Sequence, residues 1–303
     1  MEARPDKWRW PDLDEPELIR RMLLDQDSFR DLWISLSHQM PRREFTEEAF
    51  EISVGYPWAR PVGSFVLAGG EGRLLADLDE SRRSTLLEAF TGPRSGRTPM
   101  LAIGSNASPE GLWRKFAHFD DEPDRTLLAV AGTLEGFDVG ASAELALYGS
   151  MPATIFPSPD TRVEVTLIWL TPVQLKQLVW AEVPYWLGRL EARFEAERRV
   201  ATLGFPGISE SLVFVNRFGT FAPDGRPLAL AAIAAEGRRA EARTQIQLLQ
   251  RLAELVFGPE MTARELVRRA YECLDRVGPE VTRAMRSNSI PFESDRWTAY
   301  PAG

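Results

Sequence analysis

The chain has 303 residues, of which 44% are hydrophobic and 26% are charged, and its formal net charge is −8. This composition is typical of a globular protein, and the length allows one large domain or two smaller ones with a buried core. There is no long basic run, so no nucleic-acid partner is expected. The one cysteine, Cys273, excludes an intramolecular disulfide framework and any multi-cysteine metal site. Its helical surroundings predict a small buried hydrophobic side chain.

The N-terminal residues Met1–Trp10 are charged and lack the apolar segment of a secretory signal. No stretch approaches the roughly 18 apolar residues that a membrane span requires. We therefore expect a cytoplasmic protein without a membrane partner.

The first 98 residues are expected to form a helical extension with one hairpin. Apolar residues recur there at helical spacing, and Ala68–Gly72 carries the glycines of a tight turn between two β-rich runs. The predicted helices run from an Asp14 cap to Leu23, then over Phe29–Leu36, Thr46–Ile52 and Ser81–Phe90, and the predicted strands are Gly63–Gly69 and Arg73–Leu78. The linker Thr91–Thr98, with two glycines and a proline, separates this extension from a second domain over residues 99–303.

The second domain is expected to be mostly β-structure followed by two C-terminal helices. The predicted strands are Pro99–Ile103, Thr126–Phe137, Glu144–Leu147, Ala153–Phe156, Val163–Trp169, Tyr185–Phe194, Leu212–Val215 and Leu228–Ile233. The Asp-Gly step within Pro223–Arg226 predicts a turn between the last two. The C-terminal helices are predicted over Arg238–Phe257, with Ile246 on its apolar stripe, and from a capping box at Thr262 to Leu274. The tail from Arg286 is expected to be irregular.

A strand, a glycine turn and a helix start follow one another in Leu101–Pro109. Ser108 is a good N-cap and Pro109 suits the first helical position, which predicts a helix over Pro109–Phe116. Gly104 lets the backbone turn sharply and approach a ligand, and the amides of Gly104–Ala107 can hold an anion near a helix N-terminus. An ordinary strand-to-helix turn is the alternative interpretation.

A glutamate follows the next predicted helix at its C-terminal end. Thr171 to Gln174 form a capping box with a proline at the first helical position. Glu182 lies on the same face as the apolar positions of that helix, with Trp180, Tyr185 and Trp186 available as an apolar wall. Such a carboxyl group is suited to take and return a proton near neutral pH. In the alternative, the helix frays before Pro184 and Glu182 points into solvent.

Four segments together resemble the γ-glutamylcyclotransferase-like superfamily over roughly Pro99 to Arg193. Ile103-Gly-Ser-Asn106 is similar to its Tyr-Gly-Ser-Asn signature, and Tyr148 to Ile155 is similar to its Gly-x-Pro-Ala segment. Val163 to Thr171 is similar to the strand before the helix, and Val173 to Glu182 to the helix that ends in glutamate. The chain departs from the pattern at Ile103, where tyrosine is usual, at Ala107, where leucine is usual, and at Val183-Pro184, where glycine is common.

The resemblance implies an α+β fold, with a small mixed β-barrel flanked by helices. It implies that Glu182 is the catalytic acid/base and that the substrate contacts Ile103, Gly104, Ser105, Asn106, Tyr148 and Tyr185. The implied reaction is attack of an α-amine on a γ-glutamyl amide carbonyl, which releases 5-oxoproline and an amine. Neither a cofactor nor a metal is implied, because intramolecular attack is already favoured by proximity. The partner is then a small amino-acid-derived substrate.

The alternative is a non-catalytic small-molecule binding or scaffold protein that retains the fold. Other polar residues are expected to play lesser parts. His38 and His118 have no metal-ligand spacing, and His118 is expected to be solvated in an acidic loop. Arg189 and Asn216 are expected to line the pocket, whereas the pairs at 238–239 and 268–269 are expected on solvated helix faces.

Overall fold

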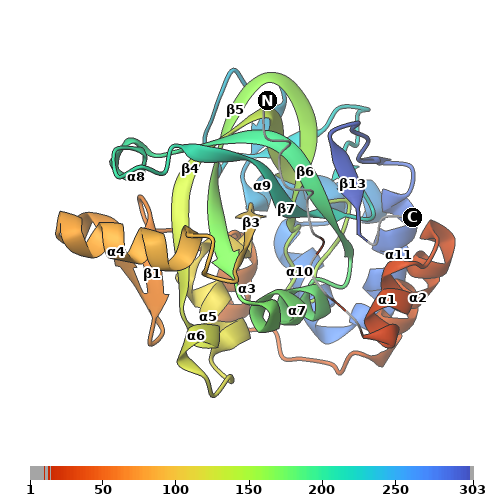
Figure 1. Cartoon of the computed structure of the whole chain (residues 1–303). Helices are drawn as coiled ribbons and strands as arrows, with labels where there is room; N and C mark the ends of the chain where they lie inside the picture. Colours follow the sequence, from red (N-terminus) through yellow and green to blue (C-terminus); the bar gives the residue numbers. More distant parts are fainter. Residues whose placement is uncertain (1–9, 11–12, 14, 301–303) are drawn as a thin grey trace.

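Five strands of the main sheet close on themselves into a small mixed barrel at the centre of the molecule (Figure 1). The computed structural model describes Trp10, Leu13 and residues 15–300. The barrel strands are β3 (Thr98–Ala102), β4 (Leu127–Ala141), β5 (Ala153–Leu170), β6 (Tyr185–Ala196) and β7 (Gly207–Asn216). They follow the order β5-β3-β7-β6-β4, and β4 pairs back with β5. The β3–β7 pair is parallel and the others are antiparallel. The predicted α+β barrel with flanking helices is confirmed.

Strand β5 joins two runs that the sequence suggested as separate strands. Pro157 and the following loop-forming residues interrupt the β pattern, yet pairing with β4 continues on both sides of them through a register shift between Glu135 and Phe137. Asp160 adopts a positive φ of 68° at this bend. The strand predicted over Glu144–Leu147 is wrong, because that stretch lies in the loop between β4 and β5.

The N-terminal region contributes helices and an additional hairpin to the barrel sheet. Its elements are α1 (Pro16–Met22), α2 (Gln26–Gln39), α3 (Glu47–Val54), β1 (Phe65–Ala68), β2 (Glu71–Leu74), the short 3₁₀ helix η1 (Leu75–Asp77) and α4 (Glu80–Thr91). Gly69 and Gly70 both have positive φ, which a two-residue hairpin loop of this kind requires. The second strand ends earlier than predicted, and β1 pairs with β4. The Asp14 cap lies outside the described residues.

Residues of β3 alternate between two hydrophobic cores. Leu101 and Ile103 belong to the larger core, which also receives side chains from α2, α3 and the C-terminal helices. Met100 and Ala102 belong to the second core, which is covered by α1, α5 (Pro109–Phe116) and α7 (Pro172–Ala181). Because successive strand residues face opposite sides, one short strand anchors both layers. The turn that follows β3 is therefore held from both sides.

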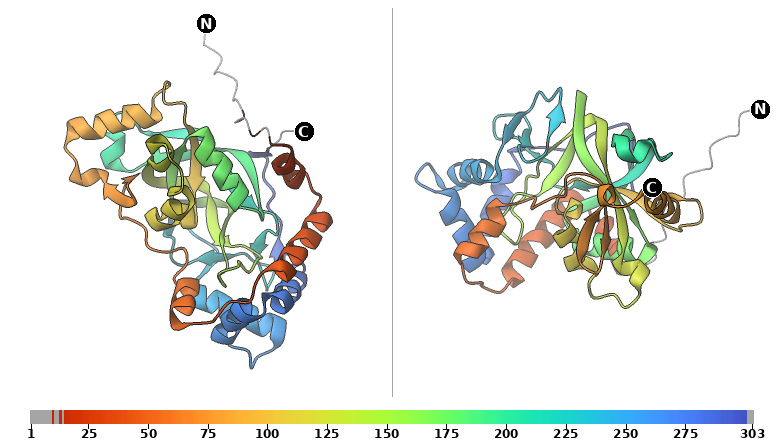
Figure 2. Two further views of the ribbon diagram at one scale, coloured as in Figure 1. Left: turned by 90° about the horizontal axis from the view of Figure 1, so that it is seen from below. Right: turned by 90° about the vertical axis from the view of Figure 1, so that its left-hand side faces the viewer.

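The C-terminal region differs most from its prediction. It contains α9 (Gln245–Phe257), α10 (Ala263–Glu272) and a third helix, α11 (Leu274–Met285), which the sequence analysis missed because Gly278 and Pro279 lie inside it. A Cβ at Gly278 would lie 2.7 Å from Ser37 Oγ, so this glycine permits the close packing of α11 on α2 (Figure 2). The remaining elements of the chain are α6 (Glu122–Arg125), α8 (Arg198–Ala201), β8 (Thr220–Phe221), β9 (Leu228–Leu230), β10 (Ala235–Glu236), β11 (Glu241–Arg243), β12 (Ser289–Ile290) and β13 (Trp297–Ala299).

The tail after Arg286 is not irregular, because β12 pairs with β8 and β13 pairs with β6. The turn at Asp224-Gly225 forms, but β7 and β9 on either side of it do not pair with each other. Ile246, predicted on the apolar stripe of α9, is 47% exposed, because the buried stripe consists of Leu248, Leu249 and Leu252.

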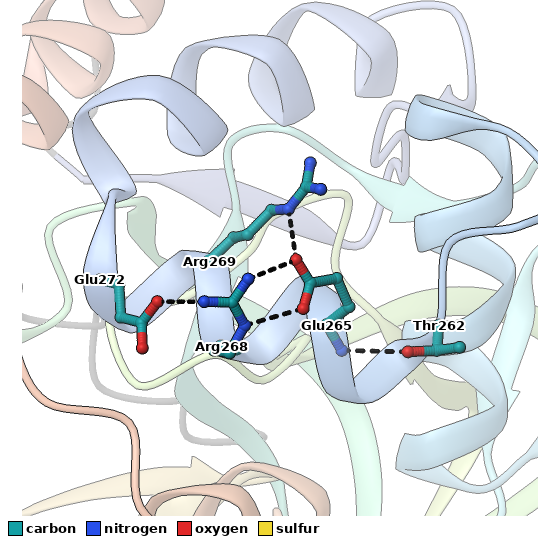
Figure 3. A network of polar contacts seen from close by, with 5 residues as sticks. All are labelled: Thr262, Glu265, Arg268, Arg269 and Glu272. Carbon is teal, nitrogen blue, oxygen red and sulfur yellow. Dashed lines mark hydrogen bonds and ion pairs between the residues drawn. The ribbon is translucent and has the colours of Figure 1, made fainter.

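Glu265 organises the polar side of α10 (Figure 3). Its amide donates to Thr262 Oγ1, so the N-cap half of the predicted capping box forms and the reciprocal side-chain half does not. Its carboxylate turns away from the cap and accepts hydrogen bonds from Arg268 and Arg269, while Arg268 also pairs with Glu272. These hydrogen bonds lower the pKa of Glu265 to about 2. The two arginines are therefore ion-paired, not merely solvated.

Two basic residues are buried against the β-structure. Arg238, predicted on a helix face, precedes α9 and donates two hydrogen bonds of 2.8 Å to the fully buried carboxylate of Asp138. Arg217 donates to the carbonyls of Arg21 and Leu24, and its guanidinium lies 3.9 Å from the centre of the Phe29 ring. Burial lowers the pKa of Arg217 to about 10. Arg217 thus fastens α1 and α2 to the end of β7.

Cys273 is half-buried at the junction of α10 and α11, and not fully buried as predicted. Within the described part of the chain, no helix is both long enough and apolar enough to cross a bilayer.

Candidate functional site

The glycine motif Ile103–Asn106 forms the turn after β3, and hydrogen bonds from Arg60 hold its backbone in place. Ile103 is buried in the larger core, and its carbonyl accepts a hydrogen bond of 2.8 Å from Arg60 Nη2, which also donates to the Gly104 carbonyl at 3.2 Å. The 3₁₀ turn η2 (Ser105–Ala107) follows, and α5 begins at Pro109 as predicted. Ser108 is the N-cap residue by position, but its buried side chain makes no capping hydrogen bond.

Glu182 meets this turn through its carboxylate. The Thr171–Gln174 capping box starts α7 as predicted, and Glu182 is the C-cap residue, with φ −94° and ψ 54°. Its Oε1 accepts a hydrogen bond of 3.0 Å from Asn106 Nδ2 and forms an ion pair with Lys115 Nζ at 2.6 Å. Lys115 also donates to Asn106 Oδ1 at 2.7 Å. The side chain of Glu182 is 17% exposed, so it neither points into solvent nor is sealed off.

Lys115 was not a predicted site residue. It lies on α5, nine residues after Asn106, and helix α5 carries its ammonium back to the turn. Its position on the helix that follows the glycine turn was the only sequence signal for a site role, and no motif includes it.

A tyrosine from the N-terminal region covers Gly104. The hydroxyl oxygen of Tyr56 accepts a hydrogen bond of 2.9 Å from the amide of Ala153. A Cβ on Gly104 would lie 2.3 Å from this oxygen. Gly104 has φ −120°, so space for the phenol, and not a positive φ, is what demands glycine here. Burial raises the pKa of Tyr56, and the nearby carboxylate of Glu182 adds to the effect.

Tyr148 and Tyr185, both predicted substrate contacts, lie near Tyr56: the first contacts its ring, and the second bonds the same residue, Ala153. Tyr148 stacks on Tyr56 with 6.1 Å between ring centres, and Trp58 lies 5.5 Å from Tyr148. Tyr185 donates from its hydroxyl to the carbonyl of Ala153 at 2.9 Å. Burial raises the pKa values of Tyr148 and Tyr185 well above the usual range, and nearby carboxylates contribute.

Two tryptophans that were expected to wall Glu182 lie elsewhere. Trp180 donates to Glu15 near α1, and Trp186 packs against Trp297 of β13. The apolar surroundings of the site come instead from Tyr56, whose segment the sequence marked only as an extended stretch.

A second carboxyl group belongs to this cluster and was missed by sequence reasoning. Glu144, in the loop after β4, is only 3% exposed and accepts a hydrogen bond of 2.6 Å from Asn216 Nδ2. Burial raises the pKa of Glu144 to about 8; the negative charge of Glu182 adds to the rise, and the Asn216 bond opposes it. One charged residue within the apolar run Ala143–Leu147 was the available signal.

Other candidates lie away from the cluster. His38 and His118 are exposed, as expected for His118. Arg189 forms ion pairs with Glu191 and Glu210 instead of lining the site. Arg60 also lines a cavity of about 630 Å³ between β4, β5 and β6, of which neither Glu182 nor Glu144 is a lining residue.

The cluster therefore brings together a fixed carboxylate, a buried carboxyl group and a backbone amide that holds a hydroxyl oxygen. A carboxylate next to an ammonium can accept a proton, and a backbone amide can bind a carbonyl or carboxylate oxygen. The Ile103–Asn106 turn and Glu182, 76 residues from Asn106, meet in one place.

No protein-family model and no curated protein sequence matches the chain. Two solved structures are similar to part of the chain, each with 16% sequence identity and a TM-score of 0.30. One is titled "Gamma-glutamyl cyclotransferase", and the match covers 40% of this chain and 66% of that one. The other is the refined crystal structure of an uncharacterized protein from Homo sapiens, with 40% and 67% covered. The chain thus spans about two thirds of these structures, and at this level of similarity neither assigns it an activity.

Proposed function

We propose that the chain is an amide-cleaving cyclotransferase that acts on a γ-glutamyl amide, or on a related amino-acid amide, to release 5-oxoproline. The observation that carries the proposal is the 3.0 Å hydrogen bond between Asn106 of the glycine turn and Glu182 at the end of α7. It joins the two motifs on which the resemblance to the γ-glutamylcyclotransferase-like superfamily depends. A carboxylate beside a turn with ligand-binding amides is the minimum that this reaction requires.

Glu182 acts as the general base in this proposal. Asn106 and Lys115 both contact Oε1, which fixes the carboxylate and leaves Oε2 outside these two contacts. Oε2 takes a proton from the substrate α-amine as its nitrogen attacks the γ-carbonyl carbon. The attack closes a five-membered ring, and such an intramolecular step gains strongly from proximity. The departing amine needs a proton, which the protonated Glu182 can return or a second acid in the site can supply.

A second candidate function is non-catalytic binding within the same fold. The observation in its favour is Tyr56, whose oxygen accepts a hydrogen bond from the amide of Ala153 and lies against Gly104. In the catalytic proposal a substrate oxygen displaces the Tyr56 oxygen or hydrogen-bonds to it. In the alternative the phenol stays in place, and the turn serves only to pack the N-terminal region.

The experiment is 5-oxoproline release from a panel of γ-glutamyl amines, γ-glutamyl dipeptides and glutathione. Glu182→Gln keeps the shape of the side chain but cannot accept the proton, so we expect a rate loss on the order of 10² to 10⁴. Glu272→Gln is the matched control, because Glu272 also ends a helix and pairs with a basic residue, Arg268. Release that survives Glu182→Gln, or no release from any member by the wild type, would contradict the proposal.

A further inference from the structure

Glu144 faces the same groups as Glu182 but has a different environment. It extends from the loop between β4 and β5, and it is 3% exposed. The carboxylate of Glu182, at the end of α7, acts on Glu144 electrostatically, and Glu144 acts in turn on Tyr185 of β6 and on Tyr148 of its own loop. Lys115 forms an ion pair with Glu182, and Arg60 donates a hydrogen bond to the carbonyl of Gly104.

The hydrogen-bond geometry indicates which oxygen of Glu144 carries a proton. Asn216 Oδ1 accepts from the amide of Phe218 at 2.9 Å, so the NH₂ group of Asn216 faces Glu144. Glu144 Oε2 is therefore an acceptor, and the proton of a neutral Glu144 resides on Oε1. Oε1 takes part in none of the hydrogen bonds between described residues, and it is not one of their fully buried unpaired polar atoms. It thus keeps a small contact with accessible space.

The two carboxyl groups have different partners. The ammonium of Lys115 contacts Glu182 directly and pairs with its negative charge. Glu144 has no cationic contact among the described residues, only the neutral amide of Asn216, and burial raises its pKa to about 8. Two carboxyl groups in such different environments, one ion-paired and one buried without a cation, are the usual arrangement for a general base and a general acid in one site.

We propose that Glu144 is the general acid of the site, donating its Oε1 proton to the leaving amine. The inference rests on the cyclotransferase function proposed above. The α-nitrogen forms a bond to the γ-carbon and loses a proton to Glu182. The amide C–N bond then breaks, and its electron pair takes the proton from Glu144. Glu182 ends protonated and Glu144 ionised, and proton exchange with water restores both.

The test compares two leaving groups across a pH series, using γ-glutamyl-p-nitroanilide and a γ-glutamyl alkylamide. p-Nitroaniline leaves with little need of a proton, whereas an alkylamine must be protonated. We expect Glu144→Gln to lower alkylamide turnover on the order of 10² to 10⁴ and to lower nitroanilide turnover less than tenfold. Glu182→Gln should lower both, because the nucleophile needs its base in either case.

The wild type alone also tests the role of Glu144, should the variant fail to fold. Its kcat should fall above about pH 8 with the alkylamide, and this fall should be absent with the nitroanilide. Equal losses for the two substrates in Glu144→Gln, or the same fall in kcat with both, would overturn the acid role while leaving the cyclotransferase intact. No turnover of either substrate by the wild type would overturn the proposed function and this role together.

Discussion

Replacing Gly104 with alanine should be tolerated only if the Tyr56 hydroxyl is removed as well. A Cβ at Gly104 would lie 2.3 Å from the Tyr56 oxygen but 3.2 Å from Ala153 Cβ, so the oxygen causes the severe clash. Overpacking of this kind costs about 1–3 kcal/mol. Tyr56→Phe alone leaves the amide of Ala153 without its acceptor, which costs about 1–3 kcal/mol. In the double variant the methyl group occupies the space of the lost oxygen.

We therefore expect the double variant to be more stable than the sum of the single changes by about 1–2 kcal/mol. Urea unfolding followed by tryptophan fluorescence measures the four free energies of unfolding, and the nine tryptophans provide the signal. Gly104→Ala combined with Tyr185→Phe is the control, because Tyr185 donates to the carbonyl of Ala153 and not to the turn. Additivity within about 0.5 kcal/mol in the Tyr56 pair would refute the packing argument.

Two further predictions concern buried charge. Folded Glu144 holds its proton up to about pH 8, whereas the unfolded chain releases it near the ordinary value of 4.5. The folded state therefore binds more protons in that window, and stability should fall as pH rises through it, by at most about 1.4 kcal/mol per unit. Urea unfolding at pH 5.5 and 7.5 should show a flatter dependence in Glu144→Gln, and parallel slopes would contradict the assignment. Asp138→Asn should lower the free energy of unfolding by about 3–5 kcal/mol, because Arg238 loses its charged partner. Asp138→Leu with Arg238→Met should recover most of that loss, and a double variant as unstable as the single one would show that the pair itself stabilises the fold.

The parts of the fold that follow local rules could be predicted from the sequence. Helices α5 and α7 start at proline-containing N-terminal signals, and these local signals do not depend on the rest of the chain. The hairpin loop at Gly69-Gly70 was found for the same reason. Helix α11 was missed because Gly278 has low helix propensity. The glycine is required by the close contact with Ser37 of α2, and the local sequence carries no sign of that long-range contact.

The residues of the candidate site also divide into those that local motifs identified and those that only the folded structure revealed. The glycine turn and Glu182 each stand in a recognisable local context, so motif and spacing were enough to identify them. Tyr56 and Glu144 reach the site from loops, 48 residues before Gly104 and 38 residues before Glu182. Their roles depend on which residues they meet in the folded chain, and only tertiary structure supplies that information.

The attachment of Arg217 has a consequence for shortened forms of the chain. Its guanidinium binds the carbonyls of Arg21 and Leu24, and its neighbour Asn216 orients Glu144. Proteolytic removal of the first 25 residues would leave a buried cation without those acceptors, one residue away from the asparagine. Helices α1 and α2 contribute no side chain to the cluster. A cleavage between them would nevertheless weaken the hydrogen bonds of Arg217, and so the end of β7 where Asn216 binds Glu144. Protease resistance of this segment is thus a readout of the order of the site.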